Sequence, residues 1–302
     1  AINQRLIHGQ RVSTEEEAIF MQEMLHVPDL YNFIHDHQEE YLFFFIPYLF
    51  ATTYYGAQIC PQRSALIPCL HDEGYAYMQL FHDLFPKVKG LAFNTHSERQ
   101  LAHQLYDTPA DQVQKVVGIG VETDFAFDDA RFRQKYKLDG PILLYVGRRS
   151  PGKNTPLLLE YWSRYVQTTG SQAKLVLIGP GDVTISPENA AHIVDLGFVP
   201  LQDKYDAYAA ADMLCQPSLN ESFSLVMMES WLTETPVLVH ARCTVTKDHC
   251  LRSNGGLYFA NYPEFAATLD YLWTHPTKAQ AMGRNGRNYV LANFEWSIVL
   301  DK

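Results

Sequence analysis

Short apolar runs alternate with amphipathic segments along the second half of the chain, from residue 141 onward. Runs such as ILLYVG, AKLVLIG and DMLCQP are apolar at successive positions, which is typical of strands buried inside a parallel sheet. The segments between them, such as NTPLLLEYWSRYVQ and LQDKYDAYAAA, carry apolar residues at helical spacing. The pattern therefore predicts an α/β unit whose parallel sheet is covered by helices on both faces.

The start of the chain carries a helix-capping signature. Ser13 or Thr14 precedes Glu16 and Glu17, and an apolar periodic run follows. A hydroxyl residue followed three residues later by glutamate is typical of a helix N-terminus. We expect one helix here and a second one in PDLYNFIHDHQ.

Strand-like runs follow at Leu42–Ile46 and Ala65–Cys69. The segment GLAFNTHSERQLAHQLY predicts a short strand and then a helix led by Ser97, and VQKVVGIGVETD predicts another strand and a turn. We therefore expect two α/β domains, 1–139 and 140–302, joined through the polar connector DDARFRQKYKLDGP.

The most apolar stretch is YLFFFIPYLFATTYYGA, from Tyr41 to Ala57. A membrane-spanning helix needs about 20 apolar residues, and Pro47 interrupts this run. The stretch is interpreted as a buried strand followed by a loop.

Composition limits the function classes. The formal net charge of −10 disfavours nucleic-acid binding, which needs a basic surface. Five cysteines without a CxxC pair, and an N-terminus without an apolar signal region, predict a cytoplasmic protein with reduced thiols. Cys243 and Cys250 could also pair or bind a metal, although small buried side chains are the simpler interpretation.

Three turns between strands and helices carry candidate chemistry, because ligands of open α/β sheets bind beyond the carboxyl ends of the strands. The first is YVGRRSPGKN, in which Gly147 ends a strand and Arg148 and Lys153 follow. Cations and backbone amides at a helix start can bind a phosphate. A solvated charge run explains the same residues, and the Walker pattern is absent.

The second turn is LIGPGD, Leu177 to Asp182, whose two glycines permit close approach of a ligand or a simple tight turn. The third is NESFSLVMMES, in which Glu221 and Glu229 flank the start of a helix capped by Ser222. The backbone amides that would then face a ligand are those of Phe223, Ser224 and Leu225. Donors for phosphate beside carboxylates for hydroxyls would suit a nucleotide sugar, but helix-dipole compensation and a solvated glutamate would explain the same spacing.

Taken together, these motifs resemble the retaining glycosyltransferases of family 4. The order GRRSPGK, LIGPGD, GFVPLQDK, NESFSLVMMES and SNGGLYF is similar to the donor-binding half of that family, over residues 140–296. The resemblance implies a GT-B fold, with two Rossmann-like domains facing a cleft and an N-terminal domain that lacks its first part. It implies transfer of a sugar from a nucleotide-diphosphate-sugar donor to an acceptor, with retention of configuration.

The resemblance also implies a role for each residue. Arg148 and Lys153 neutralise the donor diphosphate, together with the helix start at Phe223, Ser224 and Leu225. Glu221 contacts the transferred sugar and Glu229 the ribose, and Val199 and Lys204 contact the base. Leu201 replaces the acidic residue of some guanine-using relatives, which favours uridine or another base. LIPCLHDEGYAYM, FNTHSERQ and VGIGVETD resemble a subgroup in which a histidine, here His71, reaches the sugar.

The mechanism that the resemblance implies needs no cofactor and no metal, because cations and the helix start stabilise the diphosphate. The expected partners are a nucleotide sugar and a sugar or lipid-linked acceptor, at the cytoplasmic face of a membrane or free in the cytoplasm. Two alternatives stay open at this point. They are a catalytically silent nucleotide-sugar-binding protein and an epimerase of the same fold.

Overall fold

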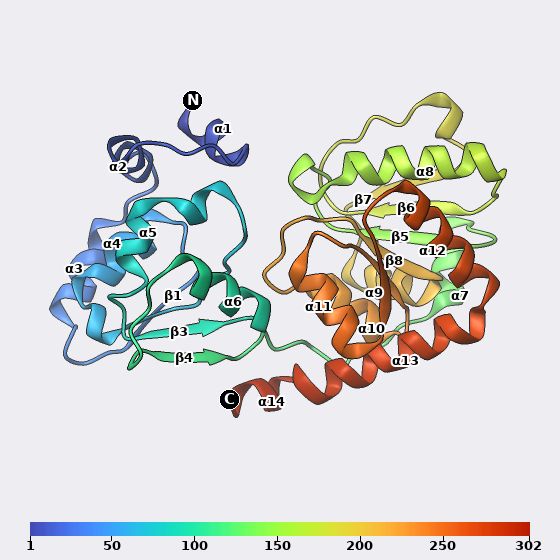
Figure 1. Ribbon diagram of the computed structural model, residues 1–302. Coiled ribbons are helices and arrows are strands. Elements are labelled where there is room, and N and C mark those ends of the chain that lie inside the picture. The colour runs from blue at the N-terminus through green and yellow to red at the C-terminus, as the bar shows by residue number, and fades with distance from the viewer. The chain divides into compact units, whose positions relative to one another are not determined.

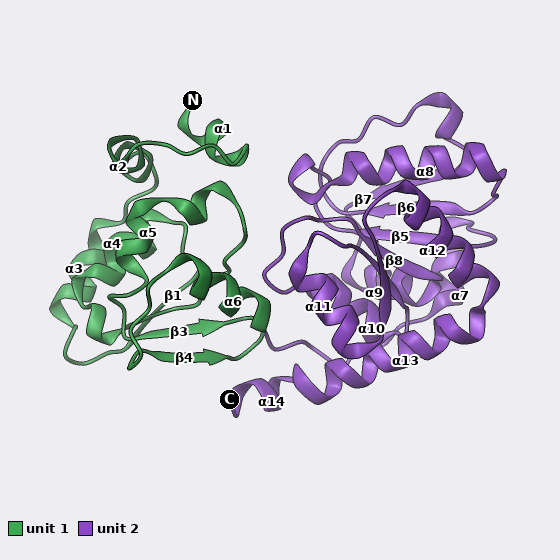
Figure 2. Ribbon diagram, in the orientation of Figure 1, with its two compact units in different colours: residues 1–118 green, residues 119–302 purple.

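The computed structural model describes residues 1–302, and the chain divides into two compact units. Unit 1 is Ala1–Gly118 and unit 2 is Ile119–Lys302 (Figures 1 and 2). Each unit contains one parallel β-sheet, as the sequence predicts. None of the helices combines the length and the apolar character that crossing a membrane requires.

Unit 1 has a four-stranded sheet in the order β1-β2-β3-β4. Its elements in chain order are α1 (Ile2–Ile7), α2 (Thr14–Gln22), α3 (Pro28–Asp36), β1 (Phe43–Phe45), α4 (Ala51–Ile59), β2 (Ser64–Leu66), α5 (Gln79–Leu84), β3 (Gly90–Phe93), α6 (His96–Leu105) and β4 (Val113–Val116). Short 3₁₀ turns at Pro61–Arg63 and Gly74–Tyr77 lie between them.

Helix starts in unit 1 follow side-chain capping. The capping box before α2 is confirmed, because Ser13 accepts from the backbone of Glu16 and the Glu16 carboxylate accepts from the backbone of Ser13. The prediction that Ser97 leads α6 is wrong. Thr95 caps that helix instead, since its hydroxyl accepts from the backbone N–H of Glu98 at 3.1 Å.

The apolar stretch from Tyr41 contains a helix that the sequence prediction missed. Only Phe45 of strand β1 is buried, and the expected loop after it is largely α4. The helix is rich in Thr and Tyr, which favour strands. Burial of Ala51 and Ala57 and a hydrogen bond from the Thr53 hydroxyl to the Pro47 carbonyl stabilise it nonetheless.

The sheet of unit 1 is covered on one face. Phe45, Leu66, Leu91 and Phe93 lie in one buried cluster with side chains from α4, α5 and α6. On the other face, Phe44 is 64% exposed. The core of this unit is therefore one layer between the sheet and its helices.

Unit 2 has a six-stranded sheet in the order β10-β9-β8-β5-β6-β7. Its elements are α7 (Asp129–Tyr136), β5 (Ile142–Val146), α8 (Thr155–Thr169), β6 (Lys174–Ile178), β7 (Ile193–Gly197), α9 (Leu201–Ala210), β8 (Met213–Gln216), α10 (Leu225–Leu232), β9 (Val237–His240), α11 (Thr244–Ser253), β10 (Gly256–Phe259), α12 (Tyr262–Thr274), α13 (Pro276–Asn293) and α14 (Trp296–Leu300). The sequence predicts every strand of this sheet but misses α7, α11 and α14.

Helices cover both faces of this sheet, as the uniformly apolar strands predict. Side chains of α8 and α12 form one buried cluster with the sheet, and side chains of α7, α9, α10 and α13 form the other. From β5 the strand order runs outward through β6 and β7 on one side and through β8, β9 and β10 on the other. The order therefore reverses between β5 and β8, the position at which open α/β sheets bind ligands.

The boundary between the units lies about 20 residues before the predicted one. The segment 119–139 belongs to unit 2 because it is anchored there at two points. Val121 donates its backbone N–H to Phe294, and Arg131 of α7 forms an ion pair with the buried Asp206 of α9. The polar composition of this connector conceals a helix whose charged side chains have partners in α9.

Candidate functional site

The candidate site lies at the carboxyl edge of the sheet in unit 2, where β5 and β8 are neighbours. The loop after β5 carries Lys153, and the loop after β8 carries Glu221. These loops also touch directly, because the Asn154 side chain donates to the carbonyl of Pro217 at 3.0 Å. Two of the three turns singled out in the sequence therefore meet at the reversal point of the sheet.

The loop after β5 is held by a buried tyrosine. The Tyr145 hydroxyl donates to the carbonyl of Arg148 at 2.7 Å and accepts from the Thr155 hydroxyl at 3.3 Å. The Arg148 side chain is exposed, and Lys153 ends a 3₁₀ turn at the loop's end. Burial raises the pKa of Tyr145 to about 12, so its hydroxyl remains a donor to the loop.

The glycines of LIGPGD have a role within the protein. Gly179 and Gly181 both have positive φ, and a Cβ atom at either would collide with the loop after β5, at the carbonyl oxygens of Gly147 and Arg149. The backbone N–H of Arg149 donates to Pro180 across this contact. The close approach that the glycines permit is therefore made by the neighbouring loop.

The helix start in the third turn differs from its prediction. Ser222 is not the N-cap of α10; the cap is Ser224, which has φ of +79°, and the helix begins at Leu225. The Phe223 side chain is buried between His249 and Phe294. The backbone amides of Phe223, Ser224 and Leu225 form no hydrogen bond within the chain, as expected at a helix N-terminus.

Glu221 and Lys153 form an ion pair. The Lys153 ammonium donates to Glu221 Oε1 at 2.6 Å, and the Gln216 amide donates to the same oxygen at 2.9 Å. The Glu221 side chain is 10% exposed and that of Lys153 is 37% exposed. Glu221, which is predicted to contact the sugar, and Lys153, which is predicted to contact the diphosphate, are therefore bonded to each other.

Three buried polar atoms in the segment from the end of β8 to the start of α10, which contains Glu221, have no hydrogen-bond partner: Gln216 Oε1, Ser218 Oγ and Ser224 Oγ. Buried polar atoms in native proteins are almost always paired, because leaving one unpaired costs about 1–3 kcal/mol. Unpaired acceptors and hydroxyls beside unused amides form a site with spare hydrogen-bonding capacity. Such a site suits a ligand with both phosphate and hydroxyl groups.

A second lysine–glutamate pair lies on α9 and α10. Lys204 donates to Glu229 Oε1 at 2.7 Å, and the buried Tyr208 hydroxyl donates to Oε2 at 2.8 Å. Both oxygens are thus held in place, although a carboxylate can accept further hydrogen bonds. Val199, the other predicted base contact, is 7% exposed and packs in the core of unit 2.

His71 belongs to unit 1, in the loop after β2. Its Nδ1 lies 3.4 Å from Glu73 Oε1, and its side chain is 28% exposed. The backbone N–H of the preceding Leu70 donates to the buried Glu98. Glu98 therefore fixes the loop that carries His71.

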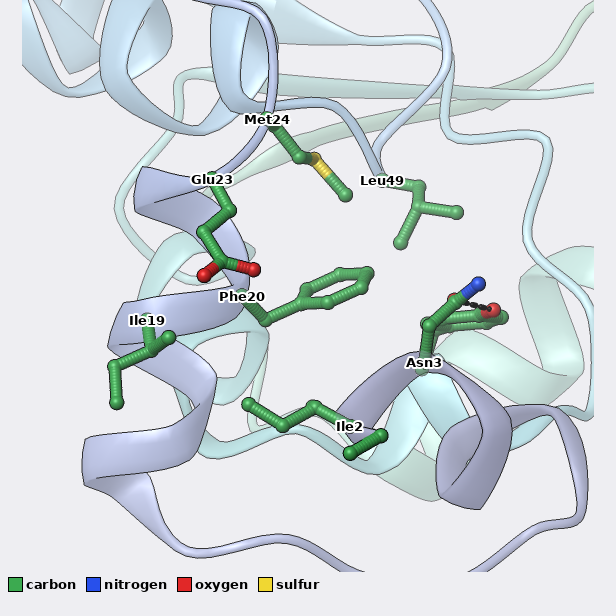
Figure 3. A pocket seen from close by; sticks show the side chains of 9 residues that line it. Ile2, Asn3, Ile19, Phe20, Glu23, Met24 and Leu49 are labelled. Atoms are coloured by element: carbon green, nitrogen blue, oxygen red, sulfur yellow. Dashed lines mark hydrogen bonds between the residues drawn. The ribbon is translucent and has the colours of Figure 1, made fainter.

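Unit 1 also contains a cavity of about 580 Å³ that includes no predicted site residue. In Figure 3 the Phe20 ring lies in this hollow with Ile2, Met24 and Leu49 around it. Glu23 supplies the one carboxylate of the lining. The cavity is chiefly apolar and has no cationic side chain.

The sequence left open whether Cys243 and Cys250 form a disulfide, bind a metal or are simply buried. Cys243 and Cys250 are buried and not disulfide-bonded, and burial raises the pKa of both thiols.

Several residues that contribute to the site were not predicted from the sequence because they lie inside strands or helices. Tyr145, Tyr208 and Gln216 occupy positions that the pattern assigns to the core, and only their polar atoms distinguish them.

The family comparison covers more than half of the chain. The family described as "Glycosyl transferases group 1" matches residues 126–289. Among curated relatives, D-inositol 3-phosphate glycosyltransferase of Kineococcus radiotolerans is 32% identical over 222 residues, 64% of this chain and 51% of the relative. The corresponding protein of Corynebacterium efficiens is 32% identical over 168 residues, 49% of this chain and 39% of the relative. The chain thus spans about half of the first relative and about two fifths of the second.

Solved structures extend the likeness to nearly the whole fold. Sucrose-phosphate synthase from Thermosynechococcus elongatus superimposes with a TM-score of 0.74 at 18% identity, covering 97% of this chain and 78% of that one. Anabaena HepE, solved in complex with UDP and glucose, gives a TM-score of 0.74 at 15% identity, covering 91% of this chain and 80% of that one. The GT-B type of fold implied by the sequence is confirmed.

Proposed function

Because the chain belongs to the group 1 glycosyl transferases, we propose that it transfers a sugar from a nucleotide-diphosphate-sugar donor to an acceptor with retention of configuration. The observation that carries this proposal is the Lys153–Glu221 contact at the edge of the sheet and the Lys204–Glu229 contact between α9 and α10, with unpaired buried polar atoms in the segment from β8 to the start of α10. Cations, acceptors and unused amides at one reversal point match the groups of a nucleotide sugar.

The donor diphosphate would lie between Arg148, Lys153 and the start of α10. The amides of Phe223, Ser224 and Leu225 and the helix dipole would add to the positive field. Glu221 would accept hydrogen bonds from the sugar hydroxyls.

The nucleoside would extend toward α9. Glu229, held by Lys204 and Tyr208, would accept from the ribose hydroxyls, and the base would lie near Val199 and Lys204. We propose uridine as the base, in keeping with Leu201 and with the UDP bound by HepE. His71 of unit 1 is proposed to contact the sugar.

The transfer step that we propose is the one that the resemblance to the retaining family implies. The bond between the anomeric carbon and the β-phosphate oxygen breaks, and the acceptor hydroxyl oxygen bonds the anomeric carbon from the same face. The hydroxyl proton passes to the departing phosphate. The protein's part is to position both substrates and to stabilise charge on the diphosphate.

A binding and turnover assay tests this proposal. We expect UDP and UDP-glucose to raise the thermal unfolding temperature, and sugar transfer to occur with an acceptor panel that includes inositol 3-phosphate and lipid-linked sugars. Lys153→Ala should lower kcat/KM at least about a hundredfold, because a charge-assisted contact is lost in the transition state. Asp248→Asn, which removes an exposed ion pair with Arg252, is the control and should have no effect.

Three outcomes would contradict the proposal. Absence of binding by every nucleoside diphosphate would refute the assignment of the site. Binding without turnover across the acceptor panel would indicate a binding protein. Conversion of the donor sugar to its epimer without an acceptor would indicate an epimerase.

A further inference from the structure

We propose that Glu221 makes the site discriminate between the sugar nucleotide and the free nucleoside diphosphate, because it competes with the diphosphate for Lys153. The inference rests on the proposed function and concerns the same site. It assigns Glu221 a second role, beyond contact with the sugar, in releasing the product nucleotide.

The ion pair is the first observation. In the structure, the Lys153 ammonium that is proposed to bind phosphate is bonded to Glu221 at 2.6 Å. Gln216 donates to the same oxygen and keeps the Glu221 carboxylate turned toward Lys153. A diphosphate that recruits Lys153 must therefore weaken this pair or bind beside it.

Burial of Glu221 strengthens its competition with the diphosphate for Lys153. The Glu221 side chain is only 10% exposed, so solvent screens its charge poorly. A phosphate that binds Lys153 must draw the ammonium away from a carboxylate that attracts it strongly. Glu221 therefore weakens the binding of any anion at Lys153 unless another group compensates its charge.

The sugar supplies that compensation. In a sugar nucleotide the terminal phosphate is esterified, so it carries one charge fewer than the terminal phosphate of a free diphosphate near neutral pH. The sugar hydroxyls can also donate to Glu221, which replaces the hydrogen bond from Lys153 and frees the ammonium for phosphate. After the sugar has been transferred, Glu221 pairs with Lys153 again, and the nucleoside diphosphate product binds less tightly.

The Lys204–Glu229 pair does not couple diphosphate binding to sugar binding in this way. Glu229 is bonded through Oε1 to Lys204 and through Oε2 to Tyr208, so its orientation does not depend on one lysine. Both groups of that pair are proposed to face the uncharged part of the nucleotide. Only in the Lys153–Glu221 pair is a residue proposed to bind the diphosphate bonded to a residue proposed to bind the sugar.

Calorimetric titration of UDP and UDP-glucose tests the inference with Glu221→Gln, which keeps the size of the side chain and removes its charge. We expect this variant to bind UDP about tenfold more tightly than the wild type, a change of about 1.4 kcal/mol, while UDP-glucose binding is unchanged or weaker. The inhibition constant of UDP in the transfer assay should fall by the same factor. Equal or weaker UDP binding by the folded variant would overturn the inference.

Lys153→Met separates competition for the ammonium from simple repulsion. In the Lys153→Met background, Glu221→Gln should improve UDP binding less than about twofold, because no lysine remains to be exchanged. An undiminished tenfold gain in that background would show that the pair does not carry the effect, and would also overturn the inference. Asp248→Asn serves as the control and should leave both affinities unchanged.

Thermal unfolding establishes that each variant is folded. If Glu221→Gln does not fold, Glu221→Asp withdraws the carboxylate from Lys153 by one methylene, and tighter UDP binding is again expected. The wild-type titration distinguishes the two proposals. If the wild type binds neither ligand, the proposed function fails; if it binds both and Glu221→Gln shows no gain for UDP, only the present inference fails.

Discussion

Glu98 is a carboxylate whose ionisation is linked to the folding of unit 1. It is 1% exposed, and its oxygens accept from the backbone amides of Leu70 at 2.7 Å and Asn94 at 2.5 Å. Burial raises its pKa from 4.5 to about 7, although the two amides and the nearby His71 act in the opposite direction. The group that fixes the loop bearing His71 is therefore half protonated near neutral pH.

The sign of the pH dependence follows from this shift. Because the folded pKa is above the unfolded value, the contribution of Glu98 to stability is fully present below pH 4.5 and is lost as the pH rises toward 7. We expect this loss to be on the order of 3 kcal/mol over that interval. Glu98→Gln should remove it, measured as a flatter dependence of unfolding free energy on pH.

Glu264→Gln is the matched control for this prediction. The exposed Glu264 also accepts hydrogen bonds at a helix start, from the backbone of Ala260 and from Asn261. This variant should leave the pH dependence as it is in the wild type. An unchanged slope in Glu98→Gln would show that another group titrates in this interval.

At the scale of single elements, the start of α10 has features that lower stability and leave polar groups available to a ligand. Ser224 adopts a left-handed backbone, which is unfavourable for a residue with a side chain, and its buried hydroxyl has no partner. Strain and an unpaired polar atom at one residue are typical of positions kept for ligand binding. The same helix is otherwise well packed, with Met227, Met228 and Trp231 fully buried.

Ser224→Gly should therefore separate stability from binding. Glycine adopts this backbone without strain, and the unpaired hydroxyl disappears, so we expect the unfolding free energy to rise by up to about 1 kcal/mol. UDP binding should weaken several-fold, because one donor to the phosphate is lost. Ser224→Ala is the control, since it removes the hydroxyl but keeps the strain; equal stability of the two variants would contradict the role of the backbone.

The elements also show how far the sequence could predict this molecule. The strands of unit 2 were predictable because they are mostly apolar, and Glu221 and Lys153 because they follow strand ends. The helix α4 was not, since its Thr and Tyr residues favour strands and only tertiary burial overrides that preference. The pairing of Lys153 with Glu221 was also out of reach, because residues 68 positions apart in sequence meet only through the strand order.

At the scale of the whole molecule, the position of the domain boundary depends on charge. The segment 119–139 reads as a polar connector, yet Asp206 and Asp203 of α9 are paired with Arg131 and Lys135 of α7. The Asp206 side chain is only 1% exposed. Without the segment 119–139, this carboxylate would lose the Arg131 guanidinium and the backbone N–H of Asp128 and would keep only the hydrogen bond from Gln202.

Two fragments of unit 2 test the boundary. We expect residues 119–302 to fold cooperatively and residues 140–302 to be less stable by about 3–5 kcal/mol, because loss of α7 leaves a buried carboxylate without its cation and uncovers the contacts of Phe132. Urea unfolding followed by tryptophan fluorescence measures both, since all four tryptophans lie after residue 140. Arg131→Ala in the longer fragment should reproduce part of the loss. Fragments of equal stability would show that α7 is a connector after all, and the boundary would return to residues 139 and 140.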